Sequence, residues 1–195
     1  MINKDIVKQH FTDSIQTKIS TADTMLDNIS EAGNVLSHTL IAGHKIFICG
    51  NGGLSSESQS FSEKMINRFN MDRPPLPVID LTSNPALITA ISRDYQYDSI
   101  YSKQLYALSN TGDTLIVMST LGNSKNIISA IKVAEEKGLN IIVLTGKNTG
   151  LISSEIRDNY IKICVDSDIS YRIQENYSLI LNCFCEIIDQ KLFGI

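Results

Sequence analysis

The most constraining feature of the sequence is a regular alternation, from residue 45 onward, of short apolar runs with longer segments of helical periodicity. The apolar runs span residues 45–49, 77–81, 114–118, 140–144 and 160–165. They are continuous rather than alternating with polar residues, which is typical of parallel strands covered on both faces. Helices are expected between and after them, at 55–69, 85–93, 99–108, 126–137 and 171–192. The pattern predicts one α/β domain over residues 1–195 with a doubly wound, five-stranded parallel sheet.

A helical region precedes the first strand. Residues 6–42 contain no proline and place apolar side chains at helical intervals. Asp27 and Asn28 interrupt the apolar pattern, so we expect two helices over residues 1–42, the second ending at Gly43. Amphipathic helices at this end favour self-association.

Composition and charge exclude several classes of protein. The 17 Lys and Arg residues are outnumbered by 21 Asp and Glu residues, giving a net charge of −4 without any basic block. Direct binding of nucleic acid is therefore not expected. No apolar run is long enough to span a bilayer, and the first residues lack the apolar segment of a secretory signal, so we expect no membrane association and a cytoplasmic location.

Cysteine and histidine spacing gives no metal site. The four cysteines lie within apolar stretches without a C-x-x-C pair, and the three histidines all fall in the first quarter of the chain. We therefore expect reduced cysteines in the core and no metal ligands among these residues.

Two glycine- and hydroxyl-rich loops follow the first and third predicted strands. The first is Gly50–Ser56 and the second is Ser119–Ser124, and each leads into a helix. Free backbone N–H groups at a helix start, beside Ser and Thr hydroxyls, suit a phosphate group. The candidate contacts are Asn51, Gly52, Ser55, Ser119, Thr120 and Ser124. The alternative is that both loops are ordinary strand-to-helix turns.

Phe47–Gly53 and Ser119–Ser124 together resemble the motifs of the sugar isomerase (SIS) domain family. Leu144–Lys147 and Arg172–Glu175 place the resemblance in the phosphoheptose isomerase branch. This resemblance implies a flavodoxin-like strand order, and conversion of sedoheptulose 7-phosphate to a heptose 7-phosphate. It also implies a homotetramer, with helices at the two ends of the chain, including residues 1–42, packed between subunits.

The same resemblance points to a missing catalytic set. Isomerases of this branch bind zinc through His, Glu, Gln and His, and the matching residues here are Ser60, Lys64, Gln174 and Asn182. Glu63 is adjacent to the Glu position, but one residue turns a helical side chain by about 100°, so we expect it to point elsewhere. We therefore predict no catalytic residue and no cofactor. Zinc would be expected only if the alternative, a phosphoheptose isomerase, holds.

Two further positions belong to the predicted sugar site. Gln174 keeps the residue type of the isomerases. Asp94 falls where they use an Asp at the sugar, and we expect it either to bind a sugar hydroxyl or to pair with Arg93 or Lys103.

A closer resemblance is to the DiaA-like branch of the family, whose members bind the replication initiator DnaA. It is carried by Phe11–Thr17, Met65–Phe69, Leu87–Ile91 and Asn182–Asp189, and by Leu192 and Phe193 near the end. It implies that Leu192 and Phe193 contact DnaA. The alternative is that these terminal apolar residues fray or pack against the rest of their own chain. We therefore predict a non-catalytic adaptor that promotes DnaA assembly at the chromosomal origin. A phosphoheptose isomerase and an inactive, phosphosugar-sensing SIS module remain the alternatives.

Overall fold

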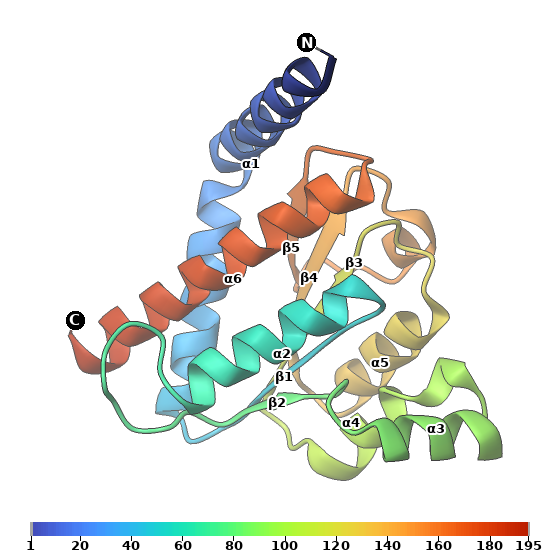
Figure 1. Ribbon diagram of the computed structural model, residues 1–195. Helices are drawn as coiled ribbons and strands as arrows, with labels where there is room; N and C mark the ends of the chain where they lie inside the picture. The colour runs from blue at the N-terminus through green and yellow to red at the C-terminus, as the bar shows by residue number, and fades with distance from the viewer. Residues whose placement is uncertain (1, 195) are drawn as a thin grey trace.

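The computed structural model describes residues 2–194 and confirms the predicted α/β sheet (Figure 1). Its five strands are β1 (Ile46–Gly50), β2 (Val78–Asp80), β3 (Thr114–Ser119), β4 (Asn140–Gly146) and β5 (Ile161–Val165). All strand pairs are parallel, and the order is β2-β1-β3-β4-β5, which is the flavodoxin-like order.

Helices cover both faces of the sheet. They are α1 (Ile2–Ile41), α2 (Gly53–Ile66), α3 (Pro85–Asp94), α4 (Ser102–Leu108), α5 (Lys125–Glu136) and α6 (Ser170–Phe193), with short 3-10 turns at Tyr97–Ser99 and Gly150–Ser154. One apolar core forms where α1, α2 and α6 pack on the sheet, and the other forms on the side of α4 and α5. None of the helices within residues 2–194 combines the length and apolarity needed to cross a membrane.

The predicted pair of N-terminal helices is in fact one helix. α1 continues without a break through Asp27 and Asn28. The Asn28 amide donates to the carbonyl of Lys162 at 3.1 Å, so this side chain bonds to β5 instead of competing for its own helix backbone. Gly33 lets α1 approach α6, because a Cβ there would lie 2.6 Å from Cδ1 of Ile187. Packing against β5 and α6 therefore keeps α1 continuous at the position of the expected break.

The first half of α1 projects beyond the rest of the molecule (Figure 1). Its exposed apolar side chains include Ile6, Val7, Phe11, Ile15 and Ile19. Among the described residues these side chains contact no apolar core, in contrast to Ala32 and Leu36 further along the helix, which are fully buried.

A buried ion pair joins α2 to α6. Arg73, in the segment after α2, donates from Nε to Oδ1 of Asp189 at 2.8 Å, and both side chains are over 90% buried. The same guanidinium donates to the carbonyl oxygens of Lys64 and Met65 at 2.9 and 2.7 Å. These carbonyls belong to the last turn of α2 and lack helical donors, so Arg73 both caps α2 and holds it against α6.

A buried carboxylate lies at the amino ends of the central strands β1 and β3. Asp113 accepts from the backbone N–H groups of Lys45 and Asn110, each at 2.8 Å, and from the Lys45 ammonium at 3.1 Å. Burial by itself raises the pKa of this carboxyl, but the two N–H groups and the Lys45 charge outweigh it, and the net pKa lies below the ordinary value.

Candidate functional site

The two glycine- and hydroxyl-rich loops meet at the carboxyl edge of the sheet. β1 and β3 are neighbours, and the chain leaves this edge to opposite sides after them, which is where folds of this order bind ligands. The loops enclose a cavity of about 250 Å³. It is lined by Asn51, Leu54, Met118, Ser119, Thr120, Leu121, Asn123 and Ser124. The structure therefore brings four of the predicted residues, Asn51, Ser119, Thr120 and Ser124, around one space.

Polar groups at this cavity are free for an anionic ligand. Ser124 precedes α5 as its N-cap residue, yet its hydroxyl makes no capping hydrogen bond. Gly52 precedes α2 with a φ of 60°, a conformation that favours glycine. The N–H groups of Leu54 and Ser55 bond to the carbonyls of Asn51 and Gly52, which leaves the N–H of Gly53 as the backbone donor at the start of α2. Two helix N-termini thus converge here with their partial positive charge. The site has the donors that a phosphate group needs.

Asn51 is held in place by a hydrogen-bonded network that sequence reasoning missed. Its amide exchanges two hydrogen bonds with the amide of the buried Asn126, at 2.9 and 2.8 Å. The Tyr101 hydroxyl lies 3.1 Å from this Oδ1 and 2.9 Å from the carbonyl oxygen of Gly50, so its single proton is shared between two acceptors. Burial raises the pKa of Tyr101, so this phenol stays protonated as a donor. No local motif marks Asn126 or Tyr101, because only the fold brings them to Asn51.

Gln174 lies against the start of α2 rather than in the cavity between the loops. Its amide lies 3.4 Å from the carbonyl of Gly53 and 3.4 Å from Oε1 of Glu57. Gly53 permits this approach, since a Cβ there would lie 2.6 Å from Oε1 of Gln174. Gln174 and Glu57 line a second cavity of about 520 Å³, which lies between α1, α2 and α6 and is also lined by Lys18, Tyr171, Glu175 and Ser178.

The residues at the family's zinc positions do not fit a zinc ion. Gln174 and the Lys64–Asn182 pair lie along the contact between α2 and α6, and the Lys64 ammonium donates to Oδ1 of Asn182 at 2.8 Å. Ser60 lies between Glu57 and Lys64 on α2. An ammonium group repels a cation, and serine hydroxyls and amides are poor replacements for the His, Cys and carboxylate ligands that zinc prefers. Within residues 2–194 no three His, Cys, Asp or Glu side chains come together as a possible metal site.

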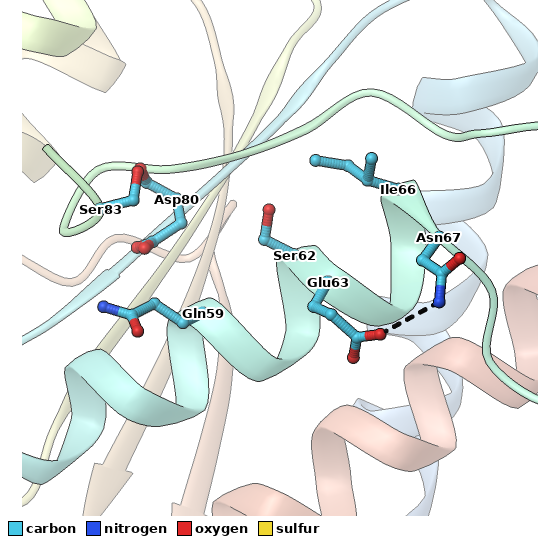
Figure 2. A pocket seen from close by; sticks show the side chains of 7 residues that line it. All are labelled: Gln59, Ser62, Glu63, Ile66, Asn67, Asp80 and Ser83. Atoms are coloured by element: carbon cyan, nitrogen blue, oxygen red, sulfur yellow. Dashed lines mark hydrogen bonds between the residues drawn. The ribbon is translucent and has the colours of Figure 1, made fainter.

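Glu63 does not line the cavity that contains Gln174, in agreement with the helical turn. It lines a cavity of about 490 Å³ together with Gln59, Ser62 and Asp80, and Oε1 of Glu63 accepts from the amide of Asn67 at 3.3 Å (Figure 2). Burial raises the pKa of the Asp80 carboxyl in this cavity. Glu63 therefore does not replace the missing carboxylate beside Gln174.

Two more predicted sugar-site residues lie outside the cavity between the loops. Asp94 makes two hydrogen bonds with the guanidinium of Arg93, at 2.7 and 3.1 Å, which is the second of the alternatives left open for it. The hydroxyl of Ser55 donates to the carbonyl of Gly52 at 2.7 Å, within the first turn of α2.

The last two apolar residues of α6 are only half-exposed. Leu192 and Phe193 pack against the core formed by α1, α2 and α6. The Phe193 ring centroid lies 6.0 Å from the guanidinium carbon of Arg73. Much of the surface of these two side chains therefore contacts residues of the same chain.

Comparison with known proteins gives consistent matches over nearly the whole chain. Residues 10–146 match the SIS domain model. Phosphoheptose isomerase of Shewanella baltica is 43% identical over 187 residues, covering 96% of this chain and 95% of its own. The solved structure of a phosphoheptose isomerase from Francisella tularensis superposes with a TM-score of 0.93 at 40% identity, covering 97% of this chain and 100% of that one. Phosphoheptose isomerase GmhA from Neisseria gonorrhoeae gives a TM-score of 0.90 at 34% identity, covering 96% and 98%.

These matches overturn the prediction of a non-catalytic adaptor for DnaA. Relatives that are similar over nearly the full length carry the name of an enzyme, which favours the isomerase alternative. The prediction gave most weight to the loss of zinc ligands and to short matches outside the SIS motifs. The half-buried state of Leu192 and Phe193 gives the adaptor no separate support.

Proposed function

Since the chain belongs to the SIS domain family, we propose that it binds a phosphoheptose at the carboxyl edge of the sheet and interconverts its ketose and aldose forms. The observation that carries this proposal is the convergence of two loops and two helix N-termini on one cavity. Full-length relatives named phosphoheptose isomerase support the choice of substrate.

The phosphate group would occupy the cavity between the loops. Ser119, Thr120 and Ser124 offer hydroxyls there, and the N–H groups of Gly53 in α2 and of Lys125 and Asn126 in α5 are the backbone donors without an acceptor. Ser119 is already oriented, because its Oγ accepts from the N–H of Gly122 at 3.1 Å. The sugar would then extend along α2 toward Gln174.

Isomerisation also needs a base that moves a proton between C1 and C2 of the sugar. Glu57 is the carboxylate that contacts Gln174, at 3.4 Å, and among the described residues this is its one polar side-chain contact. Glu175 lines the same cavity but is engaged by Ser14, Lys18 and Arg172. We assign the base to Glu57: it removes a proton from C1 of the ketose and returns one to C2.

Binding without turnover is a second candidate, favoured by the Lys64–Asn182 hydrogen bond where the family has two zinc ligands. In that case the chain would be a sugar-phosphate sensor. The two candidates share the phosphate site and differ only in the proton transfer.

One experiment separates the two candidates. The melting temperature and the isomerisation rate are measured with sedoheptulose 7-phosphate for the wild type, Ser119→Ala/Ser124→Ala, Glu57→Gln and the control Thr89→Ala, which alters an exposed hydroxyl on α3. At a ligand concentration of 100 Kd, binding stabilises by about 2.7 kcal/mol, which is roughly 5–10 °C in Tm.

We expect the double serine variant to lose the Tm shift, Glu57→Gln to keep it but lose turnover, and Thr89→Ala to match the wild type. A Tm shift without turnover in the wild type would establish the sensor and refute the isomerase. Neither shift nor turnover would refute both.

The expected homotetramer is part of the same proposal. The projecting half of α1 carries exposed Ile6, Phe11 and Ile15, and covering such side chains in an assembly is favourable. Analytical ultracentrifugation would give four times the 21.6 kDa chain mass if the tetramer forms. A monomer at micromolar concentration would refute it.

A further inference from the structure

The contact between α2 and α6 is polar at two places along its length. Near the start of α2, Gln174 approaches Gly53 and Glu57. Near the end of α2, the Lys64 ammonium bonds to Asn182. Glu57 and Lys64 are two helical turns apart on α2, and Gln174 and Asn182 are about two turns apart on α6, so the four side chains line one continuous strip.

Lys64 places an unneutralised positive charge on this strip. The residue is half-buried, and within residues 2–194 no carboxylate oxygen lies within ion-pair distance of its Nζ. Its hydrogen-bond acceptor, Asn182 Oδ1, is neutral, and the ring of Phe69, whose centroid lies 6.0 Å from Nζ, gives a cation–π contact without a negative charge. An ammonium carries three N–H donors, of which this bond uses one. A partly buried, unpaired charge is costly, and it is stabilised when a ligand supplies an oxygen acceptor.

Asn182 fixes the position of that charge. A lysine side chain is flexible, and the 2.8 Å bond to the amide oxygen restricts where its ammonium can lie. Arg73 also restricts the backbone at this position, because its guanidinium donates to the carbonyl oxygen of Lys64 at 2.9 Å and so fixes the last turn of α2. The charge is therefore pre-positioned rather than mobile.

This inference rests on the proposed function. We infer that the Lys64 ammonium, in place of a metal ion, binds the oxygen atoms at the C1–C2 end of the phosphoheptose. Asn182 is its positioning residue. The inference follows from the mismatch with a zinc site: the strip holds one ammonium, two amides and a single carboxylate, and the ammonium at the Lys64 position repels a cation but can bind the oxygen atoms of a sugar.

The step balances with these groups alone. The Glu57 carboxylate removes a proton from C1, the C1–H electron pair becomes the C1=C2 double bond, and the carbonyl pair moves onto O2. Lys64 gives a proton to O2 and regains one from the O1 hydroxyl as the C1–O1 carbonyl forms. The protonated Glu57 then delivers its proton to C2. No oxidant, reductant or metal is consumed.

The test compares binding of two probes, sedoheptulose 7-phosphate and inorganic phosphate, by titration calorimetry in the presence of EDTA. The variants are Lys64→Met, which keeps the length of the side chain, Lys64→Arg, which keeps its charge, and Asn182→Ala. Lys132→Met, on α5 and 60% exposed, is the control lysine. The melting temperature of each variant is measured first, so that only folded protein is compared.

We expect EDTA to leave wild-type binding unchanged. Lys64→Met should weaken sedoheptulose 7-phosphate binding at least tenfold while leaving inorganic phosphate binding as in the wild type, and Lys64→Arg should restore most of the loss. Asn182→Ala should give a smaller loss for the sugar phosphate alone, and Lys132→Met none.

Equal affinity of Lys64→Met and the wild type for sedoheptulose 7-phosphate would overturn the inference, as would stoichiometric zinc in the purified wild type. Failure of the proposed function looks different, because the wild type itself would then bind no sedoheptulose 7-phosphate. A gain-of-metal variant provides a second check: Ser60→His/Lys64→Glu/Asn182→His should acquire zinc, measured by elemental analysis, through the same strip. If that variant takes up no zinc, the strip does not have the geometry that the inference requires.

Discussion

Replacing Arg73 by methionine should destabilise the protein strongly. The substitution removes the partner of Asp189, whose carboxylate then stays buried without a compensating charge. It also removes the donors to the carbonyls of Lys64 and Met65 at the end of α2. Removing one partner of a buried ion pair costs about 3–5 kcal/mol. For a chain of this size that corresponds to a fall of roughly 6–20 °C in Tm.

The assay is urea unfolding followed by circular dichroism, with Arg93→Met as the matched control. Arg93 pairs with Asp94 at the same 2.7–2.8 Å distance as the buried pair, but its side chain is 77% exposed, so no measurable loss is expected. If Arg73→Met proved as stable as the wild type, water would be solvating Asp189 in solution, and the argument from burial would be refuted. Arg73→Met/Asp189→Leu should recover much of the loss, because it leaves no buried charge.

Three further predictions concern single contacts. The pKa of Asp113 is lowered by folding, so its contribution to stability is present above the unfolded pKa, near 3.9, and is lost as the pH falls through the lower folded value; urea unfolding between pH 7 and pH 2.5 should show a smaller pH dependence in Asp113→Asn. Asn126→Ala should release Asn51 and weaken phosphate binding roughly tenfold, measured by calorimetry, and an unchanged affinity would mean that Asn51 needs no support. Gly53→Ala should displace Gln174, since the new Cβ would lie 2.6 Å from its amide oxygen, and should reduce turnover of sedoheptulose 7-phosphate while leaving the melting temperature near that of the wild type.

The arrangement of strands and helices could be predicted because it depends on local patterns. Continuous apolar runs mark the buried parallel strands, and each observed strand lies within two residues of its predicted bounds. The expected break at Asp27 and Asn28 was wrong for a non-local reason: Asn28 bonds to Lys162 across the fold, which no helical periodicity reveals. The short turn at Gly150–Ser154 was missed, because its 3-10 geometry has no strong sequence signal.

The candidate site likewise has features that were predictable from the sequence and features that depend on the fold. The residue types of the two loops, and their place after neighbouring strands, were readable from the sequence, as was the loss of the zinc ligands. The pairing of Asn51 with Asn126, the approach of Gln174 to Gly53 and the Lys64–Asn182 bond were not. Each joins residues more than seventy positions apart, so each depends on packing rather than on local propensity.

The sequence by itself therefore determined the class of fold, the edge of the sheet where the candidate site lies, and which side chains are available there. Only the tertiary structure decided how those side chains are used. It placed Glu63 at a different cavity from Gln174, paired Asp94 with Arg93, half-buried Leu192 and Phe193, and set the Lys64 ammonium against an amide oxygen. Chemical identity is local, whereas the partner that fixes the orientation and charge of a side chain arrives from a distant part of the chain.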